Sequence, residues 1–207
     1  RVVPGAGATV VEHRYDGDGN VIEDLAYGTL FPLSAFDAGT IADAVAQLVS
    51  STGAHVTRHV YDGAGREAYI IDAGGYVTEK RYDGDGRVTW TLAYANAIGT
   101  PATWDVGGVN AAVTQANPST SDVRVNGFVY DAAGNVVKTF DSLSGAPSGV
   151  YTYDVRGLKT SFTNKDGQTW SYQYDSSGNL YRETSPPVVV GHFTDGQYGM
   201  DWRSIVT

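Results

Sequence analysis

The chain has 207 residues, among them 26 Gly and 14 Tyr, and it carries a formal net charge of −9. Phosphate binding needs clustered Lys and Arg, whereas the 14 basic residues here are scattered along the chain, which argues against a nucleic-acid partner. The absence of Cys excludes disulfides and thiolate metal sites, and no apolar stretch approaches the ~18 residues of a membrane-spanning helix.

A five-residue pattern, Tyr-Asp-x-x-Gly, recurs six times along the chain. Successive tyrosines lie 21 to 23 residues apart where copies follow directly, and 46 or 48 apart where an insertion intervenes. We expect the Tyr, Asp and Gly of every copy to be structural repeat residues: Tyr15, Asp16 and Gly19; Tyr61, Asp62 and Gly65; Tyr82, Asp83 and Gly86; Tyr130, Asp131 and Gly134; Tyr153, Asp154 and Gly157; Tyr174, Asp175 and Gly178.

Each copy has the composition of a tight turn between two antiparallel strands. Asp at the first position and Gly at the fourth are typical of a type I turn closed by a left-handed residue, and the Asp side chain can accept bonds from the turn's own amides. The strand that enters the turn alternates, so that His59 shares a face with Tyr61, and Tyr172 with Tyr174. The strand that leaves it is rich in β formers, as in residues 135–140.

A second set of Gly-bearing turns, such as Asp72 to Gly75, reverses the chain again. Strand, turn, strand, turn at this spacing predicts an all-β fold, an antiparallel β-hairpin meander that forms a curved sheet. Six hairpins supply about a dozen strands, and open twisted sheets rarely exceed ~10 without curling or splitting. We therefore expect open edges and self-association through them; the alternative is a closed barrel in which the first and last strands pair.

The repeat segment spans residues 1–185 and holds two expected helical insertions, at about 34–50 and 103–115. In the first, Thr40 and Asp43 form a plausible helix cap, and Ile41, Val45, Leu48 and Val49 then share one face of a helix over 40–50. In the second, Gly107 and Gly108 lower the helical propensity. Residues 186–207 form a non-repeat tail. Because the chain opens at Arg1 and ends mid-pattern, we expect a fragment of a larger protein.

These repeats resemble the RHS/YD-repeat family, whose units read roughly Tyr-x-Tyr-Asp-x-x-Gly-Arg-Leu. Gly65-Arg66 and Gly86-Arg87 match the ending closely, and Gly134-Asn135 and Gly178-Asn179 show its common Asn variant. The resemblance covers about residues 9–185. It implies repeats that build a spiralling β shell around a toxic C-terminal polypeptide or, in the teneurin relatives, a support for cell-surface adhesion.

From this resemblance we expect a structural segment of a bacterial shell that encapsulates and helps to deliver a C-terminal toxin, secreted or at the cell surface. The expected partners are the remaining repeats of the same parent chain and the encapsulated toxin polypeptide. The Gly- and Asp-rich core segment of the family, whose aspartates cleave the chain in many members, has no counterpart here. The resemblance therefore carries no autoproteolytic residue over.

Other chemistry finds little support in the sequence. The stretches that begin at Asp16 and Asp83 start like calcium loops, but Val21 and Val88 replace the required Gly and the bidentate Glu is missing. His55 and His59 share a strand face without a third zinc ligand. No Gly-x-Ser-x-Gly elbow occurs, and no Gly loop precedes a helix to cradle phosphate. We expect no metal, no cofactor and no catalytic residue, so no enzyme, unless the tail contributes one.

The aromatic rows leave one alternative function, a surface module that binds carbohydrate or a partner protein. Stacked Tyr and Trp rings can present flat apolar faces to sugars, whereas rings that tile a sheet pack on their neighbours instead. Recurrence of tyrosine in every repeat favours tiling. The exposure of Trp170 and Tyr172 is expected to separate the two hypotheses.

Overall fold

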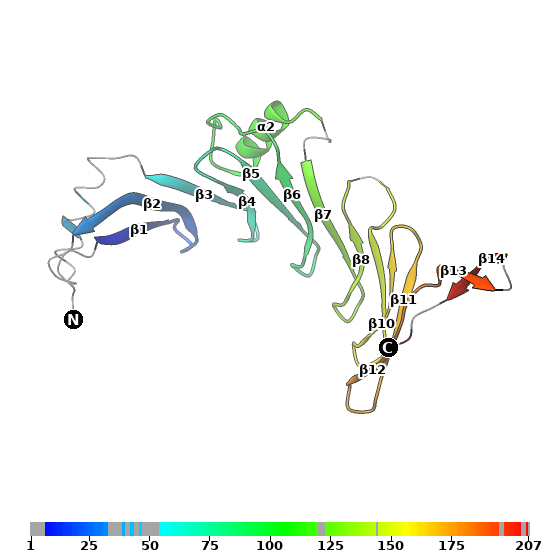
Figure 1. The fold of residues 1–207 in the computed structure, drawn as a ribbon. Helices are drawn as coiled ribbons and strands as arrows, with labels where there is room; N and C mark the ends of the chain where they lie inside the picture. Colours follow the sequence, from blue (N-terminus) through cyan, green and yellow to red (C-terminus); the bar gives the residue numbers. More distant parts are fainter. Residues whose placement is uncertain are drawn as a thin grey trace. The chain divides into compact units, whose positions relative to one another are not determined.

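The computed structural model describes residues 7–32, 39, 42–43, 46, 54–119, 123–143, 145–194, 197–203 and 206. The chain divides into two compact units, one formed by Arg1–Gly86 with Thr91–Arg124, and one by Arg87–Trp90 with Val125–Thr207. Figure 1 shows the ribbon with the strands numbered in chain order.

Twelve strands form one antiparallel sheet in which each strand neighbours the next one along the chain, from β1 to β12. The strands are β1 (Gly7–Tyr15), β2 (Val21–Pro32), β3 (His55–Tyr61), β4 (Glu67–Ile71), β5 (Val77–Tyr82), β6 (Val88–Tyr94), β7 (Val123–Tyr130), β8 (Val136–Phe140), β9 (Gly149–Tyr153), β10 (Lys159–Asn164), β11 (Thr169–Tyr174) and β12 (Leu180–Thr184). The predicted all-β hairpin meander is confirmed. Because β1 and β12 stand at opposite ends of the strand order, the described sheet is open and the closed barrel is not formed.

The Tyr-Asp-x-x-Gly segments form the turns within this meander, and we call them the YD turns. In the second, the amide of Asp62 donates to the carbonyl of Arg66 over 2.8 Å, and the amide of Gly65 donates to the carbonyl of Asp62 over 2.9 Å. Gly65 has a φ of 74°, which glycine adopts without the steric cost that a Cβ would impose. A register shift between Val60 and Tyr61 marks the bulge beside the turn.

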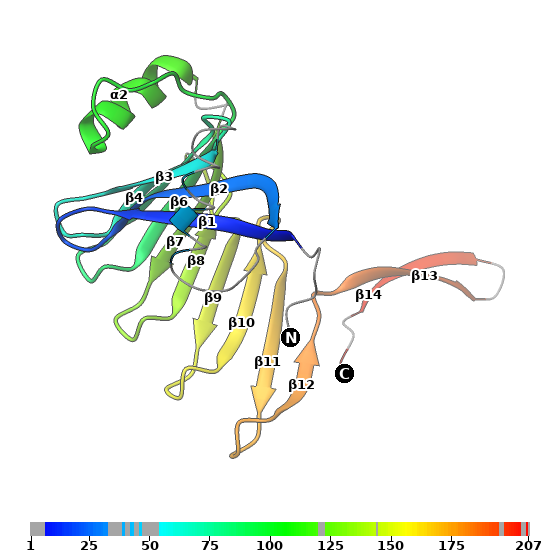
Figure 2. The same ribbon diagram turned by 90° about the vertical axis from the view of Figure 1, so that its left-hand side faces the viewer.

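Helix α2 (Val106–Ala116) covers one face of the first unit, as Figure 2 shows. Its Val109 and Val113 are buried in a cluster with Tyr69, Ile71 and Val77 of β4 and β5. Burying side chains of this size contributes roughly 1.5–3 kcal/mol each. The core of this unit therefore lies between one strand face and α2.

The second predicted insertion, about 103–115, thus contains a helix despite its two glycines. Asp105 is the N-cap, and its side chain accepts the amide of Gly108 over 2.8 Å. A Cβ at Gly108 would lie 2.2 Å from the carbonyl oxygen of Thr103, so only glycine fits. The glycine that lowers helical propensity is required by the close approach of the preceding loop.

The first predicted insertion lies mostly outside the described residues. Gly39, Ala42, Asp43 and Ala46 are described, and all four are helical. Thr40 of the predicted cap and all four residues of the predicted apolar face lie outside the described residues: Thr40, Ile41, Val45, Leu48 and Val49.

After β12 the repeat pattern ends, and the tail, which the sequence left without assigned elements, forms a hairpin of its own. Strands β13 (Val188–Thr194) and β14 (Gln197–Arg203) pair in a separate two-stranded sheet. An isolated bridge also joins Thr184 at the end of β12 to Val206. Within the described ranges, no helix has both the length and the apolar composition needed to cross a membrane.

Candidate functional site

The aspartate of every YD turn accepts backbone amides from its own turn. In the second turn, Asp62 Oδ1 accepts the amides of Ala64 and Arg66 over 2.9 and 3.0 Å. The same Oδ1 bond to the amide two residues on is made by Asp16, Asp83, Asp131, Asp154 and Asp175 at 2.9 to 3.0 Å. These bonds are the geometry that the Asp-to-Gly spacing predicts.

Hydrogen bonds to the charged carboxylate lower the pKa of five of the turn aspartates: Asp16, Asp62, Asp131, Asp154 and Asp175. For Asp62 the largest cause is the hydrogen bond from the Arg66 side chain, followed by the Arg66 backbone amide. For Asp131 it is the side chain of Asn135, which donates from Nδ2 over 3.0 Å. For Asp154 the backbone amide of Leu158 contributes most. The turns are therefore most stable with their aspartates ionised.

The residue that follows the turn glycine determines whether its side chain bonds within its own turn or to the next YD turn. Where it is Asn, as at Asn135, its side chain donates back to the aspartate of the same turn. Where it is Arg, the side chain reaches the next turn. Arg66 donates from Nη1 to the carbonyl of Asp83 over 3.1 Å, and its guanidinium lies 4.8 Å from the ring centre of Tyr82.

Two more arginines make the same link in the second unit. Arg87 reaches the carbonyl of Asp131 over 3.3 Å and lies 4.9 Å from the ring centre of Tyr130. Arg156 comes before its turn glycine, yet it reaches the carbonyl of Asp175 over 2.9 Å. A bond from one turn to the next through arginine was not predicted from the sequence. The signal for it was the arginine that directly follows the turn glycine in Gly65-Arg66 and Gly86-Arg87.

The repeat tyrosines join consecutive YD turns through a second set of bonds, which we call the tyrosine ladder. Each hydroxyl donates to the backbone carbonyl of the first residue of the strand that leaves the preceding YD turn. The five bonds are Tyr61 to Val21 (2.9 Å), Tyr82 to Glu67 (2.8 Å), Tyr130 to Val88 (2.8 Å), Tyr153 to Val136 (2.8 Å) and Tyr174 to Lys159 (3.0 Å). The tyrosine therefore bonds to the neighbouring repeat, whereas the aspartate bonds within its own.

Desolvation raises the pKa of several ladder tyrosines. For Tyr61, Tyr82 and Tyr153 burial is the largest cause. Burial disfavours the phenolate, so these hydroxyls keep the proton that the ladder bond requires.

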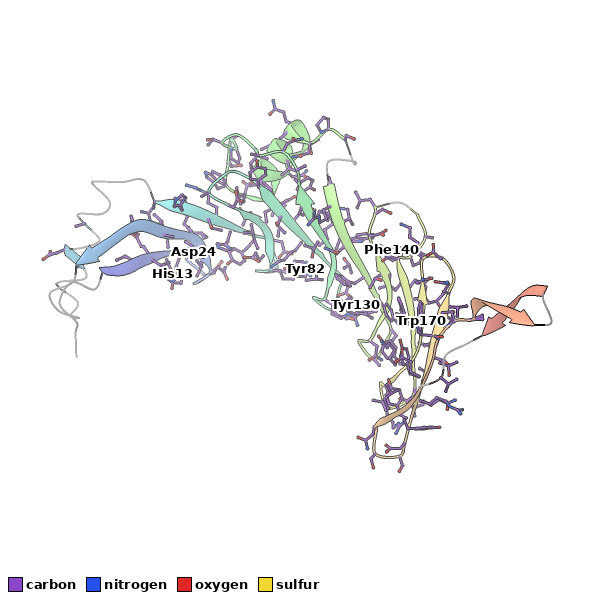
Figure 3. The ribbon with its side chains drawn as sticks, viewed as in Figure 1. His13, Asp24, Tyr82, Tyr130, Phe140 and Trp170 are labelled. Carbon is purple, nitrogen blue, oxygen red and sulfur yellow. The ribbon has the colours of Figure 1, made fainter. Side chains whose placement is uncertain are left out.

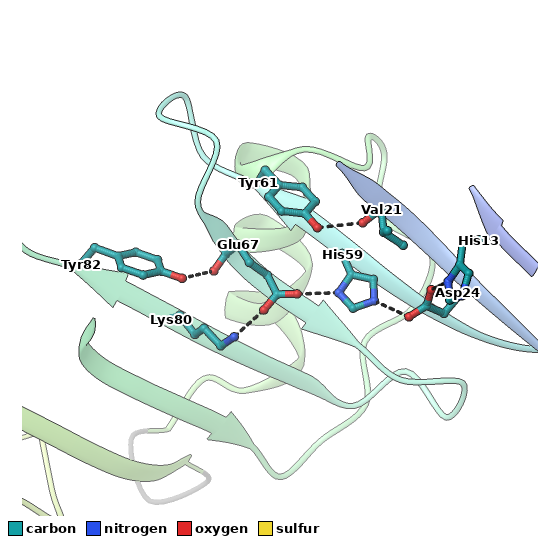
Figure 4. A network of polar contacts seen from close by, with 8 residues as sticks. All are labelled: His13, Val21, Asp24, His59, Tyr61, Glu67, Lys80 and Tyr82. Atoms are coloured by element: carbon teal, nitrogen blue, oxygen red, sulfur yellow. Dashed lines mark hydrogen bonds and ion pairs between the residues drawn. The ribbon is translucent and has the colours of Figure 1, made fainter. Parts of the chain in front are cut away.

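A row of charged side chains crosses β1 to β5 in the first unit (Figure 4). His13 Nδ1 lies 2.5 Å from Asp24 Oδ1, and His59 Nε2 lies 3.2 Å from Asp24 Oδ2. His59 Nδ1 lies 2.6 Å from Glu67 Oε1, and Lys80 donates to the other oxygen of Glu67. Imidazole or ammonium groups alternate with carboxylates from strand to strand, so each basic side chain lies beside an acceptor on the neighbouring strand.

Both nitrogens of His59 thus lie within hydrogen-bonding distance of a carboxylate, with Nδ1 beside Glu67 and Nε2 beside Asp24. His55 takes no part in this row and lies opposite Ala26 on β2. The two histidines that share a strand face in sequence therefore do not form a joint site. In the part of the chain that the structure describes, no three His, Asp or Glu side chains are grouped as a metal site would require.

In the second unit an aromatic row crosses β9 to β11 instead. Tyr151, Phe162 and Trp170 lie directly opposite one another in the strand register. Their ring centres are 5.2 and 5.4 Å apart with interplanar angles of 25° and 27°, so the rings stack from strand to strand. Trp170, labelled in Figure 3, is half-buried, as is Tyr172, over whose ring Lys159 lies at 4.6 Å.

The solvent exposure of Trp170 and Tyr172 does not by itself separate rings that tile the sheet from rings that bind glycans, since both side chains are half-buried. The stacking does bear on the question. Phe162 has Tyr151 on one side and Trp170 on the other, so both faces of its ring are occupied by neighbours. A sugar-binding ring must offer a free face, so this geometry favours tiling.

A pocket of about 500 Å³ in the first unit is lined by Arg58, Asp72, Thr100 and Trp104, among others. Its charges already have partners. Arg58 bonds to Glu23 over 2.8 Å and lies 4.4 Å from the centre of the Trp104 ring, while Asp72 accepts the amides of Gly74 and Tyr76. The pocket therefore offers no free ionic group from this set to a ligand.

Together these contacts describe a repeat scaffold, in which two-stranded hairpins join side by side through the recurring positions of one motif. Residues 153–186 match the family model described as RHS Repeat, so this part of the chain is similar in sequence to RHS repeats. The matched stretch contains the fifth and sixth YD turns. No curated protein matches the chain.

One solved structure shares the fold, and a second is similar over most of the chain at a lower score. A structure of the Photorhabdus luminescens Tc holotoxin pore with a mutation in TccC3 matches at a TM-score of 0.54 and 14% identity, over 93% of this chain and 9% of that one. A crystal structure of TcdB2-TccC3 matches at a TM-score of 0.43 and 17% identity, over 87% of this chain and 9% of that one. The chain thus spans about a tenth of the length of these relatives.

Proposed function

We propose that the chain is a structural segment of a bacterial RHS/YD-repeat shell, secreted or at the cell surface, that encloses a C-terminal toxin polypeptide and helps to deliver it. The observation that carries this proposal is the tyrosine ladder in an open sheet. Every repeat bonds to the one before it through the same two atoms, so the sheet can be lengthened by adding further hairpins.

The described side chains support a structural rather than a catalytic role. The YD aspartates are occupied by the amides of their own turns, and the tyrosine hydroxyls of the ladder are occupied by carbonyls. The fold is shared with the Tc holotoxin pore structure, which carries a mutation in TccC3. In this proposal the partners are the other repeats of the same parent chain and the enclosed polypeptide.

Protease protection tests the proposal. The longest natural polypeptide that contains this chain is digested, and survival of its C-terminal region is compared with that of the same region expressed alone. Enclosure predicts slow cleavage in the long polypeptide and rapid cleavage of the isolated region. Equal cleavage rates in the two would contradict enclosure.

A matched control removes one period of the repeat, residues 154–174, which leaves Tyr153 joined to Asp175 and so preserves the YD motif. A shell shortened by one hairpin is expected to protect the C-terminal region less. A glycan-binding module, the alternative function, predicts instead that the 207-residue chain binds immobilised oligosaccharides and that Trp170→Ala abolishes binding. The rings stacked on both faces of Phe162 do not favour that outcome.

A further inference from the structure

The two end strands of the sheet carry large side chains that are exposed to solvent. Tyr15 on β1 is 59% exposed and Tyr181 on β12 is 62% exposed, and Val11 and Leu180 are exposed beside them. The other five repeat tyrosines are half-buried. Apolar exposure is therefore found at both ends of the strand order.

The tyrosine ladder also stops at these two strands. Tyr15 is the first repeat tyrosine, and among the described residues its hydroxyl has no acceptor. Leu180 is the first residue of the strand that leaves the sixth YD turn, the position held by Glu67 and Lys159 in earlier repeats, and within the described ranges its carbonyl receives no tyrosine. One end of the chain thus presents a ladder donor, and the other end presents a ladder acceptor.

The inner junctions fix the strand register that joins donor to acceptor. Lys138 lies opposite Val150, and continuing this register places Tyr153 opposite Asn135. Phe162 lies opposite Trp170, which places Tyr174 opposite Leu158. In each junction the repeat tyrosine is opposite the residue that directly follows the preceding turn glycine. The pairs Glu23 with Arg58 and Tyr69 with Glu79 give the same rule in the first unit.

We propose that, in the 207-residue chain taken apart from any flanking repeats, β1 of one copy adds antiparallel to β12 of a second copy, head to tail, and that the Tyr15 hydroxyl donates to the Leu180 carbonyl. The inference rests on the proposed function, a sheet that lengthens hairpin by hairpin, in which neighbouring repeats of the parent chain would use these same two edges. The ladder register then places Tyr15 opposite Asn179, Glu12 opposite Arg182 and Val11 opposite Glu183.

Charge and edge chemistry fit this pairing. Glu12 and Arg182 have opposite charge and would lie directly across from one another, an arrangement that stabilises antiparallel pairs. An unpaired strand edge is in general a template for strand addition. The bridge from Thr184 to Val206 marks the end of the available edge on β12, so the contact spans Leu180 to Glu183.

Engineered cysteines test the register, because the chain contains no Cys of its own. Two single variants, Val11→Cys and Glu183→Cys, are purified, mixed under mild oxidation and separated under denaturing conditions with and without reductant. Residues directly opposite in antiparallel strands are about 4.5–5.5 Å apart at Cα, within the range of a disulfide. Mixed dimers are expected to form faster than dimers of either variant alone.

Arg182→Cys is the matched control, since a shift of one residue turns the side chain to the other face of the sheet. Its mixture with Val11→Cys is expected to cross-link slowly. Adding Tyr15→Phe to Val11→Cys is expected to weaken association about five-fold, the factor that corresponds to one hydrogen bond of about 1 kcal/mol. Circular dichroism of every variant verifies that the sheet is retained.

Equal cross-linking of the Glu183→Cys and Arg182→Cys mixtures would overturn the proposed register. A doubly substituted chain, Val11→Cys with Glu183→Cys, that forms its disulfide only within a monomer would show a sheet closed on itself and would also overturn it. Failure of the shell proposal has a different readout, equal protease cleavage of the C-terminal region in the long polypeptide and alone. The two inferences can therefore fail separately.

Discussion

Tyr82 donates a hydrogen bond to the backbone carbonyl of Glu67 over 2.8 Å, and the side chain of the same glutamate bonds to His59 and Lys80. Glu67 is thus held through its backbone by the repeat motif and through its side chain by the charged row. Burial raises the pKa of this carboxyl, and the bonds from Lys80 and His59 outweigh it, so that the net shift is downward. One residue therefore couples β3, β4 and β5.

Removal of one ladder hydroxyl is expected to cost about 0.5–1.5 kcal/mol of unfolding free energy, the net worth of a typical hydrogen bond. Tyr82→Phe removes the hydroxyl and retains the ring that packs under Arg66. Urea denaturation followed by circular dichroism measures the change. Tyr15→Phe is the control: dilute samples should show no loss, and an equal loss there would contradict the ladder as the cause.

Loss of a turn aspartate is expected to be costlier than loss of an exposed charge. Asp62→Ala removes the acceptor of two turn amides and of the Arg66 side chain, and the expected destabilisation is about 0.5–2 kcal/mol, as for comparable caps. Asp62→Asn is the conservative control, because Asn164 already fills the same role and accepts the amides of Asp166 and Gln168. Asp62→Asn should retain most of the stability.

The same pair of variants separates turn geometry from charge through its pH dependence. The pKa of Asp62 is lowered in the folded chain, chiefly by the Arg66 side chain, so the folded state binds this proton less tightly than the unfolded state. Its stabilisation is present above the ordinary carboxyl pKa of about 4 and is lost as the pH falls through the folded value. Asp62→Asn should therefore lose less stability as the pH falls below about 4 than the unmodified chain does. If both lose the same amount, the loss of stability in acid comes from other carboxylates.

A methyl group at Gly127 is expected to disrupt the second unit. A Cβ there would lie 2.4 Å from the ring of Trp90, which also packs on Phe140 with ring centres 5.6 Å apart. Overpacking of this kind costs about 1–3 kcal/mol. Gly63→Ala, at a turn position with open space around it, is the control and should be nearly neutral. Thermal unfolding monitored by Trp fluorescence compares the two.

Alkaline pH is expected to destabilise the first unit. Burial raises the pKa of Tyr69 to about 12, and the nearby charge of Glu79 adds to the shift. Because the folded state resists forming the phenolate, the stabilisation is complete below the ordinary tyrosine pKa of about 10 and declines as the pH rises toward 12. Phenolate absorbance and circular dichroism, recorded together, should change together in that range. Tyr69→Phe should reduce the loss of stability between about pH 10 and 12, because it removes the phenol that ionises there.

We expect no specific binding site for calcium or zinc. Asp16 Oδ1 accepts two amides, those of Asp18 and Asn20, and Oδ2 accepts the Asn20 side chain, so this carboxylate is already engaged. Titration calorimetry should detect no stoichiometric site tighter than about micromolar, the range of sensor loops. A stoichiometric heat at that affinity would contradict the turn interpretation.

The sequence predicts the turns and the meander well because both follow from short-range spacing. Asp62 and Gly65 are three residues apart, and the turn that they form needs no distant partner. The tyrosine ladder was not predicted, because Tyr130 and Val88 are brought together only by the register of strands that an insertion separates. For α2 the propensity of Gly107 and Gly108 suggested a weaker helix, yet the Asp105 cap and packing of Val109 and Val113 stabilise it.

Some missed features had a signal. Gly127 inside a strand pattern commonly marks a close approach by another group, here the Trp90 ring. The charged row across β1 to β5 also had a signal in the sequence. The residue two positions before the repeat tyrosine is His13, His59 or Lys80 in the first three repeats. In the last three that position is Phe128, Tyr151 or Tyr172. Chemistry at one motif position therefore indicates which unit a repeat joins.

The presence of either an arginine or an asparagine beside the glycine of a YD turn has a mechanical consequence for the join between that turn and the next. Joins after Arg66, Arg87 and Arg156 contain a guanidinium bond from one turn to the next in addition to the ladder bond. At the joins after Asn20 and Asn135 the amide side chain bonds only within its own turn. Between the turns themselves, twisting one hairpin against the next must therefore break the guanidinium bond as well as the ladder bond at an arginine join, but only the ladder bond at an asparagine join. Away from the turns the join after Asn20 is also held by the Arg58–Glu23 and His59–Asp24 contacts, so the added torsional stiffness of the arginine joins is local to the turn edge of the sheet.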